Sequence, residues 1–207
     1  MHPNFERDVY LVNQKHMAWG KSKYFVYDDA GTPLFYVERP TMRLFGRKAP
    51  ITIFEDEAGK TPMLIAQQDH NWEFRRREYT LVEAGSNEVL GHLRRDNLRS
   101  LFKRAWTIED ADGRLIATAR EDSTFLAFAR RIIDFIPYVG ILGFALLKTD
   151  FHIFRVNEQG ERKVGSFDRK MGLLDKYVLN LREDPERTLD RRIAVTLGVL
   201  LDTAEAR

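Results

Sequence analysis

A hairpin motif that recurs five times constrains the fold of this chain more than any other feature of its 207 residues. Each copy has an apolar strand, an acidic or polar turn that contains glycine, and a second apolar strand. The copies span residues 24–37, 51–66, 79–93, 106–117 and 151–167, around Gly31, Gly59, Gly85, Gly113 and Gly160. Because β-branched and aromatic residues flank a glycine turn, each copy predicts a β-hairpin. The intervals between the glycines are 28, 26, 28 and 47 residues, so the last one indicates a period plus an insertion.

The number of predicted strands favours a closed sheet. Five hairpins supply ten strands, and residues 8–13 and 176–181 predict two more. About twelve antiparallel strands are too many for a comfortable open sheet, and closure removes the exposed edges. A barrel of about eight strands is filled by its own side chains, so about twelve should enclose a lumen that admits a helix about 10 Å across. We therefore predict a mainly β fold with a single domain over residues 1–207, built as a closed antiparallel barrel of about twelve strands.

A candidate for that lumen lies near the C-terminus. Residues 193–201 carry no charge and are apolar on every side of a helix. Such a helix must be enclosed by protein or lipid, and this stretch is far short of the roughly 20 residues that span a bilayer. Asp184 as the N-cap, Pro185 at the first helical position and Glu186 in the first turn predict that the helix begins there. We expect a lumenal helix over residues 185–204; an amphipathic helix on the surface is the alternative.

Three segments give this architecture a family resemblance. A late strand at residues 173–179 precedes the apolar helix at 190–202, and residues 101–110 resemble a strand entry of scramblase-like proteins. The chain thus resembles the LURP-one-related and phospholipid-scramblase branch of the tubby C-terminal superfamily over nearly its whole length. The resemblance implies a twelve-stranded barrel around a C-terminal hydrophobic helix. It also implies phosphoinositide binding, lipid movement or transcription-linked roles, because one fold can host several functions.

Composition excludes several function classes. The 33 lysine and arginine residues nearly balance 31 acidic ones, so bulk charge does not favour a nucleic-acid partner. No cysteine is present, which excludes disulfides, thiolate zinc sites and a cysteine nucleophile. The five histidines show no metal-ligand spacing, and no phosphate-binding loop or nucleophile motif occurs. We expect no enzymatic activity, no cofactor and no metal site; the acidic turn at residues 109–113 lacks the spacing of an EF-hand and indicates turn chemistry.

A basic cluster provides the first candidate binding site. Guanidinium groups make paired contacts with phosphate, and the apolar neighbours Leu98, Leu101 and Phe102 could lie against acyl chains. A solvated loop balanced by Asp96 and the acidic turns is the alternative. The predicted headgroup-binding residues are Arg94, Arg95, Arg99, Lys103 and Arg104.

The insertion at residues 123–147 provides the second candidate. Apolar residues recur at helical spacing up to Pro137, which ends or kinks the helix, and residues 135–147 are uncharged. That run is too short to span a bilayer but long enough to enter its interface. The alternative is a helical flap that packs over a barrel mouth. The predicted membrane or partner contacts are Phe125, Phe128, Ile132, Phe135, Ile136, Tyr138, Ile141, Leu142 and Phe144.

Two functions therefore compete. The first is a non-enzymatic barrel that associates with membrane surfaces or anionic phospholipid headgroups through both candidate segments. The second is a soluble interaction or scaffold protein that buries the insertion against a protein partner. The N-terminus has no continuous apolar run typical of a signal peptide, so we expect a cytoplasmic location, free or peripherally attached to a membrane.

Overall fold

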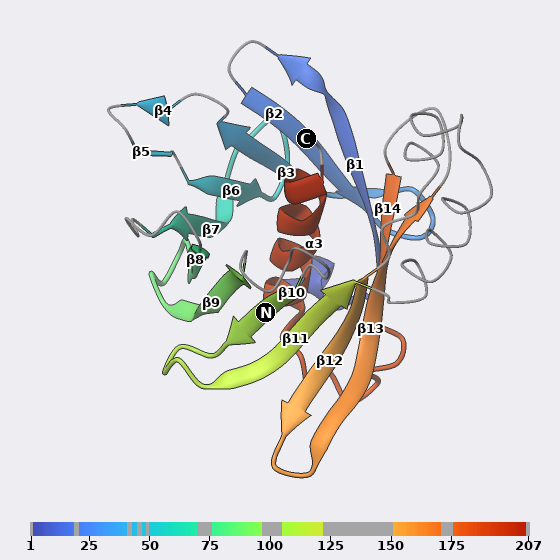
Figure 1. Cartoon of the computed structure of the whole chain (residues 1–207). Coiled ribbons are helices and arrows are strands. Elements are labelled where there is room, and N and C mark those ends of the chain that lie inside the picture. The colour runs from blue at the N-terminus through green and yellow to red at the C-terminus, as the bar shows by residue number, and fades with distance from the viewer. Residues whose placement is uncertain are drawn as a thin grey trace, which may run out of the picture.

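Twelve strands of the computed structural model form one closed antiparallel barrel, as predicted (Figure 1). The structure describes residues 2–18, 21–40, 43–44, 47–48, 50–69, 76–96, 105–121, 151–170 and 176–205. Around the barrel the strands follow the order β1-β14-β13-β12-β11-β10-β9-β8-β7-β6-β3-β2. Their bounds are β1 Val9–Ala18, β2 Lys21–Tyr27, β3 Pro33–Pro40, β6 Ile51–Phe54, β7 Pro62–Gln68, β8 Arg76–Glu83, β9 Val89–Asp96, β10 Ala105–Glu109, β11 Leu115–Glu121, β12 Phe151–Asn157, β13 Gly160–Lys170 and β14 Lys176–Asn180.

Among the described residues, three short elements lie outside the barrel wall. A 3-10 helix, η1, spans Pro3–Phe5, and its Phe5 ring stacks on Phe35 of β3 with centroids 4.5 Å apart. The strands β4, Arg43–Leu44, and β5, Arg47–Lys48, form a separate two-stranded sheet that the repeat did not predict. The predicted helical insertion at residues 123–147 lies outside the described residues.

The five hairpins of the repeat are the strand pairs β2–β3, β6–β7, β8–β9, β10–β11 and β12–β13. A turn that joins antiparallel strands needs a residue with positive φ, which glycine adopts without steric cost. Gly31, Gly113 and Gly160 adopt it, with φ of 85°, 80° and 125°. In the other two turns the residue with positive φ is Lys60 or Asn87, one or two residues after the glycine.

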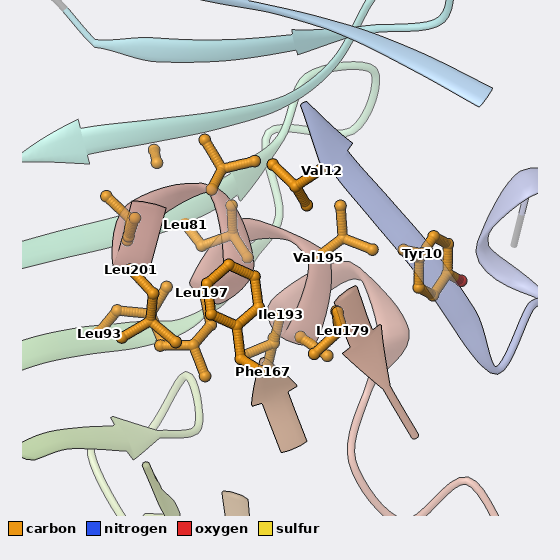
Figure 2. Packing of buried hydrophobic residues seen from close by; sticks show 14 of the residues in the cluster. Tyr10, Val12, Leu81, Leu93, Phe167, Leu179, Ile193, Val195, Leu197 and Leu201 are labelled. Atoms are coloured by element: carbon orange, nitrogen blue, oxygen red, sulfur yellow. The ribbon is translucent and has the colours of Figure 1, made fainter. Parts of the chain in front are cut away.

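The C-terminal helix α3, Arg191–Glu205, runs through the ring of strands (Figure 1). Its apolar residues from Ile193 to Leu201 are at most 3% exposed and belong to the same cluster as the inward-facing strand residues. Figure 2 shows Val195 lying toward Tyr10 and Val12 of β1, and Leu201 toward Leu93 of β9. Burying each such side chain contributes about 1.5–3 kcal/mol, which explains why a segment with mediocre helix propensity is helical here. The prediction of a lumenal helix is confirmed.

The start of this helix was predicted six residues too early. Asp190, and not Asp184, caps it: Asp190 Oδ1 accepts a hydrogen bond from the backbone N–H of Arg192 at 2.8 Å. Residues 185–190 form turns and bends, with Arg187 at a φ of 53°. Asp184 is 0% exposed and accepts hydrogen bonds from the backbone N–H groups of Thr188 and Leu189, both at 3.0 Å. The acid and proline that resemble a helix start therefore build a turn that leads the chain into the lumen.

Arg191, the first helical residue, anchors α3 at this turn. Its guanidinium is 1% exposed and lies 2.8 Å from Asp184 Oδ2 and 3.0 Å from Asp8 Oδ1. It also donates to the backbone oxygens of Asp184, Leu189 and Leu181 at 2.9, 3.3 and 3.4 Å. Burial by itself raises the pKa of the Asp184 carboxyl, but hydrogen bonds from Leu189, Thr188 and Arg191 together hold this pKa below its ordinary value of 3.8.

The two ends of the barrel differ in the connections that they carry. One end, here named the turn end, holds the five hairpin turns and the segment that precedes α3. The strands β1, β3, β7, β9, β11 and β13 end at the other end, the loop end, so the remaining connections between strands start and end there, at residues 19–20, 41–50, 69–75, 97–104, 122–150 and 171–175. Because α3 enters the lumen from the turn end, its C-terminal residues lie toward the loop end (Figure 1).

Candidate functional site

Two of the five predicted headgroup-binding residues lie in the described part of the chain. Arg94 and Arg95 are neighbours in β9, near the loop end. Arg99, Lys103 and Arg104 lie outside the described residues, as do all nine predicted contacts of the insertion: Phe125, Phe128, Ile132, Phe135, Ile136, Tyr138, Ile141, Leu142 and Phe144. Their roles therefore stay predictions.

Arg94 is paired with two carboxylates on the outer face of the barrel. Its Nε lies 2.8 Å from Glu78 Oε1 of β8, and its Nη1 lies 2.8 Å from Glu109 Oε1 of β10. These contacts follow from register, because Glu78 is directly opposite Arg94, and Glu109 is opposite the nearby His92. The Arg94 side chain keeps 41% of its surface exposed. A phosphate group that binds Arg94 must therefore compete with carboxylates that already neutralise it.

Arg95 does not extend this site. Successive side chains of a strand point to opposite faces, so Arg95 shares the face of Leu93, which is buried in the core. In register, Arg95 lies opposite Trp106 of β10, and the Trp106 ring stacks on Tyr79 of β8 with centroids 6.2 Å apart. Arg94 and Arg95 therefore cannot bind one headgroup as a continuous patch, although the sequence places them side by side.

Around Arg94 the structure assembles a polar cluster that the sequence did not reveal. It consists of Asp69, Glu78, Thr80, His92, Arg94 and Glu109, from four neighbouring strands or their ends, and we name it the outer polar cluster. Ligand atoms of Asp69, Glu78 and His92 all lie within 4.8 Å of one another, and the three residues are half-buried. The intervals of 9 and 14 residues between them match no motif, so only strand register brings them together.

Thr80 connects two members of the cluster. Its hydroxyl donates to Asp69 Oδ2 at 2.7 Å and lies 3.2 Å from His92 Nδ1. A hydroxyl has a single hydrogen, so once it is donated to Asp69 the oxygen can only accept from the imidazole. This network assigns the proton to Nδ1 of neutral His92 and leaves Nε2 with a free lone pair.

Charge in the cluster is negative. Three carboxylates, from Asp69, Glu78 and Glu109, face the single guanidinium of Arg94, so the formal charge is −2 while His92 is neutral. The Glu109 residue is 9% exposed, which places one of these carboxylates against the barrel wall. Such a site attracts cations. The outer polar cluster is thus unsuited to anions, which is a second reason to seek headgroup contacts beyond Arg94.

Comparison with known protein families agrees with the architecture. The model of one family, described as LURP-one-related, matches residues 44–202. The chain belongs to the LURP-one-related family. A comparison with curated proteins and one with solved structures gave no match. The match spans nine of the twelve barrel strands and most of α3, so most of the wall and of the lumenal helix of this LURP-one-related chain lies within the matched region.

Proposed function

We propose that this LURP-one-related barrel is a non-enzymatic, cytoplasmic protein that associates peripherally with anionic membrane surfaces through its loop end. The observation that carries the proposal is the separation of charge between the two ends. The five hairpin turns contain nine acidic and two basic residues, a formal charge of −7. The six loop-end connections contain ten basic and six acidic residues, a formal charge of +4. A barrel with this polarity turns its loop end toward a negative surface.

The basic residues of the connections are better candidates than Arg94. The 97–104 connection alone holds Arg99, Lys103 and Arg104 and no acidic residue. A cation close to an anionic leaflet contributes about 1 kcal/mol to binding, so three of them supply about 3 kcal/mol. The connection that holds the uncharged residues 135–147 leaves β11 and enters β12 at the same barrel end, and these residues could add apolar contacts in the interface. No helix in the described part of the chain is long and apolar enough to cross a membrane.

Salt bridges show that the separation is not complete. Lys23 Nζ of β2 lies 3.1 Å from Glu57 Oε1, which belongs to the turn after the short strand β6. This pairing and a side-chain hydrogen bond to Tyr36 raise the pKa of Lys23, so its charge is retained at neutral pH. Lys23 is nevertheless matched by an acidic partner. The proposal therefore depends on the two connections that hold three basic residues and no acidic one, 41–50 and 97–104.

Liposome sedimentation tests the proposal with two variants of equal charge change. The loop-end variant is R99A/K103A/R104A. The turn-end control is R114A/R182A/K163A, whose members are partly or largely exposed in the structure. With vesicles that contain phosphatidylserine, we expect the loop-end variant to bind roughly 100-fold more weakly, from about 3 kcal/mol of lost attraction. We expect the control to bind within twofold of the wild type, and raised salt to weaken the wild type.

Two outcomes contradict the proposal. Equal losses in both variants would mean that net charge alone, and not the loop end, governs binding. No binding of the wild type to phosphatidylserine vesicles at low salt would reject membrane association. In that case, a lipid-free complex that requires residues 125–147 in size-exclusion chromatography would support the interaction or scaffold function.

A further inference from the structure

Asp69, Glu78 and His92 meet on the outer wall because three strands pair in a fixed register. The backbone N–H of Asp69, which directly follows β7, donates to the carbonyl oxygen of Glu78 of β8 at 3.0 Å, so the two residues are neighbours across the β7–β8 pair. His92 of β9 is directly opposite Thr80 of β8, two residues from Glu78 and on the same face. Cross-strand neighbours have Cβ atoms about 5 Å apart, a separation that lets their side chains reach a shared point. Backbone pairing thus preorganises the three donors.

The donor set is that of a transition-metal site. Calcium and magnesium prefer oxygen ligands alone, whereas zinc accepts imidazole nitrogen together with carboxylate oxygen. Zinc with bonds of about 2.0–2.1 Å and tetrahedral angles has ligand atoms about 3.4 Å apart. One possible ligand atom from each of the three residues lies within 4.8 Å of the other two, so closing on an ion requires rotation of the half-buried side chains. A water molecule would complete the four ligands.

The neighbours of the three donors suit this role. A metal-binding histidine usually donates its second ring N–H to a fixed acceptor, and the Thr80 hydroxyl accepts from Nδ1 of His92 at 3.2 Å. That bond leaves Nε2 as the free donor. The pair with Arg94 uses Glu78 Oε1, and the bond from Thr80 uses Asp69 Oδ2, so each carboxylate has a second oxygen to offer. The formal charge of −2 would be neutralised by a divalent ion.

We propose that Asp69, Glu78 and His92 form a divalent transition-metal site that takes Zn²⁺. The site is independent of membrane association through the 97–104 connection, since none of its three ligands lies in that connection. Thr80 acts as a positioning residue that holds Asp69 and the His92 ring. No spacing in the sequence indicates the site, because its ligands come from both strands of the β8–β9 hairpin and from the segment that joins this hairpin to β7.

Isothermal titration of the full-length chain with Zn²⁺ tests the site. We expect one Zn²⁺ per chain, and a dissociation constant at least 100-fold weaker in H92A and in D69N. T80V should weaken binding about 10- to 100-fold, the usual effect of removing a group that orients a ligand. The matched control is H152A, because His152 lies on the wall in β12, with the Phe154 ring as its neighbour at 6.4 Å. We expect H152A to bind within twofold of the wild type.

A second measurement separates ligation from folding and from binding at other histidines. Near-ultraviolet circular dichroism of each variant reports whether the barrel is intact. Co²⁺ added in place of Zn²⁺ should give a visible spectrum in the wild type that is lost in H92A and kept in H152A. The proposal is overturned if Zn²⁺ does not bind, if H92A binds as tightly as the wild type, or if H152A loses affinity as strongly as H92A. Vesicle binding that is unchanged by H92A agrees with the independence of the two sites.

Discussion

Replacing Arg191 with methionine should lower the free energy of unfolding by about 3 kcal/mol. The change removes a buried cation 2.8 Å from the Asp184 carboxylate, which is 0% exposed and keeps the more distant guanidinium of Arg162, at 3.7 Å, as a countercharge. Breaking a buried ion pair from one side typically costs about 3–5 kcal/mol. We expect the lower part of this range because Asp184 keeps its hydrogen bonds from Thr188 and Leu189, and because methionine restores some apolar burial at the mouth of the lumen.

Urea denaturation followed by tryptophan fluorescence measures this loss. The same substitution at Arg182 is the control, since Arg182 is 66% exposed and lies 3.6 Å from Asp29, itself 65% exposed. Exposed pairs contribute roughly 0–1 kcal/mol, so R182M should unfold nearly like the wild type. For a chain of this size, 3 kcal/mol corresponds to a fall in Tm of about 6–12 °C. If R191M and R182M differ by less than about 1 kcal/mol, the anchoring role of Arg191 is wrong.

Three further predictions concern the same core. Gly165→Ala should destabilise the barrel by about 1–3 kcal/mol in chemical denaturation, because an added Cβ would lie 2.5 Å from the backbone oxygen of Asn180. Gly85→Ala should be nearly neutral, because a Cβ added there would have no atom of the described residues within 4 Å. Leu197→Ala in α3 should lower the free energy of unfolding by about 2–5 kcal/mol, because it opens a cavity in the lumen. Leu115→Ala, at a side chain that is 46% exposed, should lower it by less than about 0.5 kcal/mol. Similar Tm values for the two variants would contradict an enclosed helix. The folded-state pKa of Asp184 lies below its unfolded value, so the ionised carboxylate contributes to stability above pH 3.8, and this contribution is lost as the pH falls through the lowered pKa. Acid unfolding followed by circular dichroism should therefore depend less on pH in this range for D184N than for the wild type.

Strand register decided what each polar residue of the wall does. The sequence shows Arg94 and Arg95 as one basic pair, but alternation along β9 sends them to opposite faces, and β8 and β10 supply the carboxylates that neutralise Arg94. The same holds for His92 of β9, because its neighbours Asp69 and Glu78 could be known only from the pairing of β7, β8 and β9.

Local sequence by itself determined the hairpins, the closed barrel and the lumenal helix. Turn chemistry acts over a few residues, and a long uncharged apolar stretch must be enclosed wherever it lies, so neither conclusion needs distant contacts. The start of α3 shows the limit of such reasoning. Asp184 and Pro185 have the residue types of a helix start, but the buried guanidinium of Arg191 and the approach of Asp8 turn Asp184 into the centre of an anchoring network. Only tertiary structure decides such partners, because a charge removed from water is stabilised by whichever groups the closed barrel brings within hydrogen-bonding distance.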